Sequence, residues 1–86
     1  MRSFKYIITD PVGIHARPAG LLAKEAKQFT DAQITITKDG NTVKASQLMM
    51  LMSLGVKQGD EITVCAEGAG EDTAIEKMEE FLKANL

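Results

Sequence analysis

The sequence predicts an α+β fold of two layers, in which helices cover one face of an antiparallel sheet. Four short segments alternate apolar and polar residues, as half-buried strands do, and three others repeat apolar residues at helical spacing. Their order along the chain is β-α-β-β-α-β-α. Half-buried alternating strands are typical of antiparallel sheets. The 86 residues suffice for one modest core, so we expect a single domain over residues 1–86.

A strand, a helix and a β-hairpin are expected in the first half of the chain. Pro11 and Gly13 end the first strand, and Pro18 suits the first turn of a helix. Asp39–Gly40 is a sequence typical of a hairpin turn. In order, the expected elements are a strand over 4–9, a helix beginning at 16–18, and strands over 32–37 and 41–45.

A short helix, a strand and a long helix are expected after the hairpin. Ser46 is the candidate N-cap of the short helix, and Gly55 is its candidate C-terminal stop. Acidic residues open the last helix, where they match the positive end of its dipole. The remaining elements are a strand over 60–67 and a helix over 71–86.

Composition argues against several classes of function. A net charge of −2 provides no overall positive field for nucleic acid or an anionic membrane. No apolar run approaches the ~20 residues of a membrane span, and the N-terminus lacks a signal-peptide pattern. The single cysteine, Cys65, fits a reducing cytoplasm and is expected to be a small buried side chain rather than a reactive thiol. One cysteine and one histidine are too few for a metal site, so we expect neither metal nor cofactor.

His15, the only histidine, lies in the stretch GIHARP. Because Pro18 favours a helix that begins here, the unpaired N–H groups of Ala16 and Arg17 are expected beside His15. A helix start with an arginine suits a phosphate, and neutral imidazole is a competent nucleophile near neutral pH. These features suggest a transient phosphate site on His15. A lone histidine before a helix is more often an exposed loop residue, and the residues alone leave that alternative open.

Two longer stretches carry a resemblance to a known family, GIHARPAGLLAKEAKQF and SQLMMLMSLGVKQGDEITVCAEG. They resemble the HPr family, the phosphocarriers of the bacterial phosphoenolpyruvate-dependent sugar phosphotransferase system. The first stretch is similar to the phosphohistidine motif of that family, and the second to its signature around a regulatory serine. The resemblance spans nearly the whole chain. It implies an open-faced sandwich whose antiparallel sheet has the strand order 1-4-2-3.

The resemblance implies a covalent phosphocarrier rather than an enzyme, with catalysis supplied by its partners. His15 would accept a phosphoryl group on Nδ1 from phosphorylated enzyme I and donate it to enzyme IIA domains of sugar transporters. Arg17 would stabilise the phosphate, which the backbone of Ala16 and Arg17 would bind. Ser46 matches the serine that an HPr kinase/phosphorylase modifies in many Gram-positive bacteria, which would link the chain to carbon catabolite regulation and a transcriptional regulator. We expect a cytoplasmic monomer.

The main alternative is an HPr-like regulatory binding protein, controlled through Ser46 and carrying no sugar-system phosphate. The regulatory paralogue in the family lacks the histidine that this chain has at position 15, which favours the carrier. Gln47, Met49 and Met50 depart from the pattern of the Gram-positive members beside Ser46. The phosphohistidine motif carries no such departure.

The run LMMLM is expected to combine core and surface positions. Helical spacing assigns Leu48, Leu51 and Met52 to the core and leaves Met49 and Met50 exposed. Clustered exposed apolar residues are typical of a protein-binding surface, and methionine adapts to several partners. Methionine as a simple core filler is the alternative. The residues predicted to dock enzyme I and enzyme IIA are Leu48, Met49, Met50, Leu51, Met52, Lys24 and Lys27.

Overall fold

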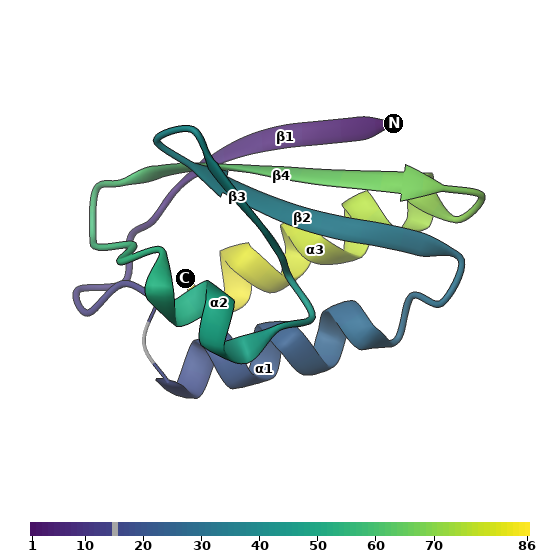
Figure 1. The fold of residues 1–86 in the computed structure, drawn as a ribbon. Coiled ribbons are helices and arrows are strands. Elements are labelled where there is room, and N and C mark those ends of the chain that lie inside the picture. Colours follow the sequence, from purple (N-terminus) through teal and green to yellow (C-terminus); the bar gives the residue numbers. More distant parts are fainter. Residues whose placement is uncertain (15) are drawn as a thin grey trace.

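The element order of the computed structural model is the predicted one, β-α-β-β-α-β-α (Figure 1). The structure describes residues 1–14 and 16–86. The predicted boundaries agree within about two residues with the observed ones, and the N-cap of the short helix is displaced by one residue. The elements are β1 (Arg2–Ile7), α1 (Ala16–Lys27), β2 (Ala32–Lys38), β3 (Asn41–Lys44), α2 (Leu48–Ser53), β4 (Glu61–Gly68) and α3 (Glu71–Asn85).

The four strands form one antiparallel sheet in the order β1-β4-β2-β3, which confirms the predicted topology. The central strand β4 pairs with both β1 and β2, so Val64 lies opposite Phe4 on one side and opposite Ile36 on the other. The three helices lie on one side of the sheet, and its other face is open (Figure 1). This is the expected two-layer, open-faced sandwich.

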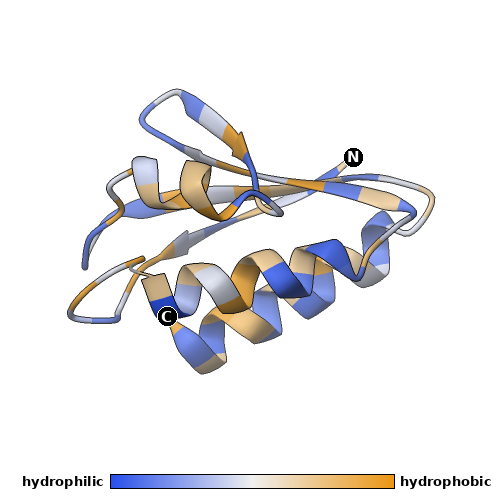
Figure 2. Cartoon of the chain, turned by 60° about the horizontal axis from the view of Figure 1, so that its bottom comes forward, coloured by the Kyte–Doolittle hydropathy of each residue, from blue (hydrophilic) through white to orange (hydrophobic). Residues whose placement is uncertain are grey.

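The core lies between the sheet and the helices, as the alternating strands require. Ile34 and Ile36 of β2 point inward with Ile62 and Val64 of β4, while the residues between them face the open side. Figure 2 shows the same alternation of apolar and polar residues along the strands. Helices α1 and α3 bury one apolar stripe each. None of the helices within the described ranges is long and apolar enough to cross a membrane. The stripes consist of Pro18, Ala19, Leu22, Ala23 and Ala26 on α1, and of Ala74, Ile75, Met78 and Leu82 on α3.

Cys65 differs from the expectation of a buried side chain. It has the opposite parity to Ile62 and Val64 in β4, and therefore lies on the open face, half-buried between Ser3 of β1 and Thr35 of β2. The strand assignment is confirmed, but the thiol is half-buried on the open face instead of fully buried in the core.

The start of α2 also differs from the prediction. The N-cap is Gln47, whose backbone is extended (φ −108°, ψ 101°) and whose carbonyl accepts the first helical bond from the Leu51 N–H at 3.0 Å. Ser46 lies one residue before the cap, in a turn closed by the Gln47 N–H and the Lys44 carbonyl at 3.1 Å. The Gln47 side chain makes no capping hydrogen bond. The predicted stop is confirmed, because Gly55 follows the C-cap with a positive φ of 65°.

Only one side chain of α2 is fully buried. Leu51 has no exposed surface, whereas Leu48 and Met52 are 38% and 40% exposed and were wrongly assigned to the core. A helix of six residues has room for little more than one inward position, so its flanking residues remain at the surface. Met49 and Met50 are exposed, as predicted.

The loop between α2 and β4 is bonded to two other segments, the end of β2 and the end of β1. The Lys38 ammonium lies 3.0 Å from Oδ2 of Asp60 and donates to the Gly55 carbonyl at 2.9 Å. Asp60 Oδ2 also accepts from the Lys57 N–H at 2.8 Å. The Ile8 N–H donates to the Asp60 carbonyl at 3.0 Å, which fastens the same loop to the end of β1.

Gly13 packs directly on this loop. A Cβ built at Gly13 would lie 2.3 Å from the Val56 carbonyl oxygen and 2.7 Å from the Lys57 Cα, and the backbone of Gly13 has a φ of +79°. Backbone atoms cannot move aside as the end of a flexible side chain can. Position 13 therefore requires glycine for both its conformation and its contact.

Gly13→Ala is expected to lower the free energy of unfolding by about 2–4 kcal/mol, because it adds backbone strain and a steric clash. Gly20→Ala is the matched control: Gly20 lies in α1, and a Cβ there would have no heavy atom within 4 Å. This control should gain up to about 1 kcal/mol through helix propensity. Urea unfolding measures both variants. A Gly13→Ala protein as stable as the parent would contradict the described packing.

Asp60 should contribute to the pH dependence of stability. The Lys57 N–H and the Lys38 ammonium lower the pKa of Asp60 below its usual value, and such a carboxylate stabilises the fold above its unfolded-state pKa. That contribution is lost as the pH falls through the lowered, folded-state pKa. Asp60→Asn should therefore flatten the acid side of the stability curve, measured by urea unfolding from about pH 6 to pH 2. In a Lys38→Met background the same change should be smaller, and an equal change would show that the ion pair contributes nothing.

Candidate functional site

The site expected at the start of α1 is built around position 15. His15 itself lies outside the described residues. On its N-terminal side Ile14 is buried, and the Ile14 N–H donates to the Val56 carbonyl at 3.1 Å. On its C-terminal side Ala16 is the exposed first residue of α1. The chain before position 15 is thus held against the loop at Val56, and the chain after it begins α1.

The loop before position 15 is folded on Asp10. The side chain of Asp10 accepts from the Val12 N–H at 2.8 Å, and its carbonyl accepts from the Gly13 N–H at 3.0 Å. At the far end of the chain, the Leu86 carbonyl accepts from the N–H groups of Thr9 and Asp10, at 2.7 and 2.9 Å. The Thr9 hydroxyl donates to the same oxygen at 2.7 Å. The end of α3 is therefore fixed beside this loop.

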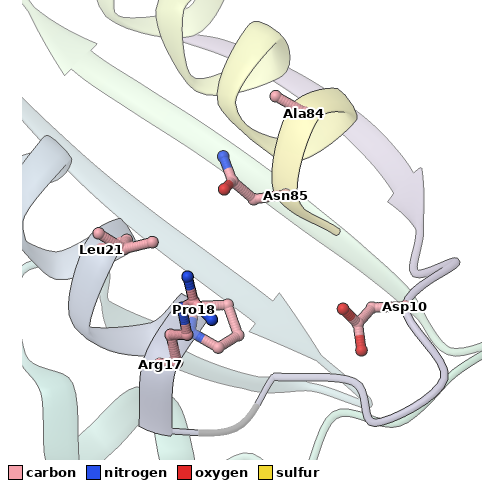
Figure 3. Close-up of a pocket in the computed structure, with 6 residues that line it drawn as sticks. All are labelled: Asp10, Arg17, Pro18, Leu21, Ala84 and Asn85. Atoms are coloured by element: carbon pink, nitrogen blue, oxygen red, sulfur yellow. The ribbon is translucent and has the colours of Figure 1, made fainter.

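A cavity of about 270 Å³ lies between the start of α1, the end of α3 and the loop at Asp10 (Figure 3). Arg17 contributes a cation to its wall, and Asp10 contributes a carboxylate from the loop. The Asn85 side chain lines a third side of the cavity, at the end of α3, and donates to the Phe81 carbonyl at 3.0 Å. Residues lining this cavity are Asp10, Arg17, Pro18, Leu21, Ala84 and Asn85.

The first turn of α1 can hold an anion. Because the helix begins at Ala16, the N–H groups of Ala16 and Arg17 have no intrahelical acceptor and lie at the positive end of the helix dipole. Arg17 is exposed and Pro18 is buried, which anchors the turn while its charged side chain stays accessible. The structure therefore brings together Ala16, Arg17 and the segment that precedes position 15.

The predicted docking residues divide into three groups. Leu48, Met49 and Met52 follow one another around one side of α2 by their helical spacing, and Met49 is the most exposed at 76%. Met50 is 45% exposed and lines a groove with β3 on the other side of the helix. Leu51 is fully buried, so its assignment as a contact residue was wrong.

The predicted basic and regulatory residues lie at the opposite end of α1 from position 15. Lys24 and Lys27 are exposed in its last turn. Ser46 is half-buried, and it lines a cavity with Lys27 and Lys44. Ser46 thus lies near one of the lysines predicted to bind partners.

Sequence reasoning missed the contributions of Asp10, Ala84 and Asn85 to the cavity at Arg17. Asp10 was part of a recognised turn, but nothing in its type indicated a position facing Arg17. Ala84 and Asn85 are far from Arg17 along the chain and reach it only because Leu86 is bound by Thr9 and Asp10. No local pattern carries that information.

Comparisons with known proteins agree with this geometry. The model of a family described as "PTS HPr component phosphorylation site" matches residues 2–84. The phosphocarrier protein HPr of Mycoplasma genitalium is 40% identical over 85 residues, which cover 99% of this chain and 97% of the relative. A solved histidine-containing phosphocarrier protein from Mycoplasma has a TM-score of 0.92 at 40% identity, with 96% of this chain and 93% of that one covered.

A further solved structure is more distant. Crh, a catabolite repression protein of Bacillus subtilis, forms a domain-swapped, intertwined dimer and has a TM-score of 0.77 at 37% identity, covering 100% of this chain and 98% of its own. The family match spans the start of α1, the short helix and the whole sheet, and the relatives are similar over nearly their full length. The chain belongs to the HPr family, the phosphocarrier proteins of the phosphotransferase system.

Proposed function

We propose that this protein carries a phosphoryl group on His15, accepting it from phosphorylated enzyme I and donating it to enzyme IIA domains of sugar transporters. The observation that carries the proposal is the match of the phosphorylation-site family to residues 2–84, which include the only histidine of the chain. The exposed arginine two residues later, in the first turn of a helix, supports the same function.

In this proposal the chain supplies the acceptor and a moderate electrostatic environment. In the first transfer, Nδ1 of His15 forms a bond to phosphorus as the donor's bond to phosphorus breaks. In the second transfer, the bond between Nδ1 and phosphorus breaks as the acceptor on enzyme IIA forms its own bond to phosphorus. The Arg17 guanidinium and the free N–H groups of Ala16 and Arg17 stabilise the negative oxygens. Asp10, across the cavity from Arg17, opposes tight binding of a dianion. A carrier that releases its phosphoryl group in every cycle needs this balance.

Partner docking is proposed at the exposed side chains of α2. Leu48, Met49 and Met52 present apolar surface, with Met50 at the groove beside β3, and such a surface suits enzyme I and enzyme IIA. Lys24 and Lys27 add positive charge for acidic partners. Leu51 supports α2 from beneath instead of touching a partner.

Regulation is proposed through phosphorylation of Ser46 by an HPr kinase/phosphorylase, with a transcriptional regulator as a further partner. Negative charge on Ser46 would weaken the encounter with an acidic donor surface. A cytoplasmic monomer is proposed as the working form. The likeness to Crh supports a second candidate, a regulatory binding protein without sugar-system phosphotransfer.

The carrier proposal predicts phosphate on a single residue. Incubation with enzyme I and phosphoenolpyruvate should give acid-labile, base-stable phosphate on the parent protein, and His15→Ala should abolish it. Ser46→Ala is the control, because it removes the proposed regulatory hydroxyl and should leave the acid-labile phosphate in place. Radiolabelled phosphoenolpyruvate with acid and base treatment gives the measurement. Undiminished label in His15→Ala would contradict the proposal that His15 carries the phosphoryl group. The regulatory binding protein would then remain as the candidate function.

Arg17 is predicted to act on phosphate transfer more than on stability. Arg17→Ala should slow phosphorylation by enzyme I by about tenfold to a hundredfold, because a cation beside the transferred group is lost. The free energy of unfolding should change by less than about 0.5 kcal/mol, since the side chain is exposed. The matched control is Arg2→Ala, an exposed arginine on β1 that pairs with Asp72 at 2.7 Å. If Arg2→Ala also slowed phosphorylation by enzyme I, the effect would be one of overall charge. If Arg17→Ala left the phosphorylation rate unchanged, Arg17 would not be part of the site.

A further inference from the structure

We propose that the cavity beside Ser46 is a phosphate seat, in which Lys27 and Lys44 bind the phosphate carried by Ser46. This inference rests on the proposed phosphorylation of Ser46, and it states where the phosphate goes and what it changes. The cavity lies where the end of α1, the start of β2 and the end of β3 meet. Its polar lining consists of Lys27, Lys44, Gln33 and Ser46, and Phe29 forms part of the apolar wall.

The dimensions and charge of the cavity suit a phosphate monoester. Its volume of about 270 Å³ is several times the roughly 30 Å³ that one water molecule occupies, so a phosphate and its bridging waters can be accommodated. Its described lining holds two lysines and no carboxylate. Phosphoserine brings about −1.5 to −2 charges at neutral pH, which two ammonium groups offset.

Both lysines are available for this role. Lys27 and Lys44 are exposed, and the ion pairs found among the described residues involve Met1, Arg2 and Lys38 instead. Ser46 is half-buried in the turn that follows β3, next but one to Lys44. The Lys44 carbonyl accepts from the Gln47 N–H, which fixes the backbone on either side of the Ser46 hydroxyl. The lysines are thus presented by α1 and β3, and the serine by the turn that follows β3.

The start of α2 does not offer the phosphate an equivalent partner. Gln47, not Ser46, occupies the N-cap, and α2 has only six residues. The N–H groups at the start of α2, which follow Gln47, carry only partial charges. The ammonium groups of Lys27 on α1 and Lys44 on β3 would add full positive charges to them.

A phosphate bound in this cavity would make one of the lysines proposed for docking unavailable to partner proteins. Lys27 is one of the two α1 lysines proposed to meet acidic partners, and a phosphate on Ser46 would engage it within the chain. Phosphorylation would then weaken partner binding in two ways, by adding negative charge and by removing a positive contact. The second effect depends on the geometry of the cavity and concerns Lys27.

The test uses the full chain with phosphoserine incorporated at position 46 during translation, so neither a kinase nor enzyme I is required. A ³¹P NMR titration measures the second pKa of the phosphate in the parent and in five variants: Lys27→Gln, Lys44→Gln, the double variant, Lys24→Gln and Lys27→Arg. Lys24 is the matched control, because it is exposed in the same last turn of α1 and does not line the cavity. Lys27→Arg keeps the charge and serves as the conservative variant.

Each cavity lysine should lower the second pKa of the phosphate by about 0.5, so the double variant should reduce the acid dissociation constant about tenfold. Lys27→Arg should retain the parent value, and Lys24→Gln should cause a much smaller change. A double variant that titrates like the parent, or a Lys24→Gln that shifts as far as Lys27→Gln, would overturn the seat. Neither result bears on phosphate transfer through His15, which the enzyme I assay tests separately.

Discussion

The backbone contact between Gly13 and the loop at Val56 is the constraint on which the arrangement at position 15 depends. A residue with a side chain at position 13 would overlap the Val56 carbonyl, and that same carbonyl accepts from the Ile14 N–H. The loop is in turn fixed by Lys38, Asp60 and the end of β1. The path of the chain into α1 is therefore set by backbone packing and ion pairing in a region far from Arg17 in sequence. The exposed side chain of Arg17 takes no part in these backbone contacts.

Most of the fold was predictable because its signals are local. Alternation in β2 and β4, helical spacing in α1 and α3, and the Asp39–Gly40 turn each act over a few residues, and all agree with the structure. The arginine at the helix start was predictable for the same reason. The errors arose where one residue decides the outcome. Ser46 satisfied the chemistry of an N-cap, yet the chain enters α2 one residue later, at Gln47.

Features that depend on distant contacts could not be predicted from the sequence. The cavity at Arg17 needs Asn85, which is brought there by the bonds between Leu86 and the loop at Thr9. The meeting of Lys27, Lys44 and Ser46 likewise depends on how α1 packs over the sheet edge. Leu48 and Met52 were assigned to the core by periodicity alone, but so short a helix buries only Leu51. The number of inward positions on a helix is decided by its length as well as by its pattern.

The open face of the sheet gives this molecule a side that none of the residues proposed to dock enzyme I and enzyme IIA occupies. Its residues include the chain's single thiol, Cys65, which points away from the layer that holds α1 and α3. Side chains on the two faces of a sheet project in opposite directions, so a spectroscopic reporter attached to Cys65 would be separated from the helix layer by the full thickness of the sheet. One native attachment point on an unused surface makes association with protein partners observable without altering any side chain that contacts them.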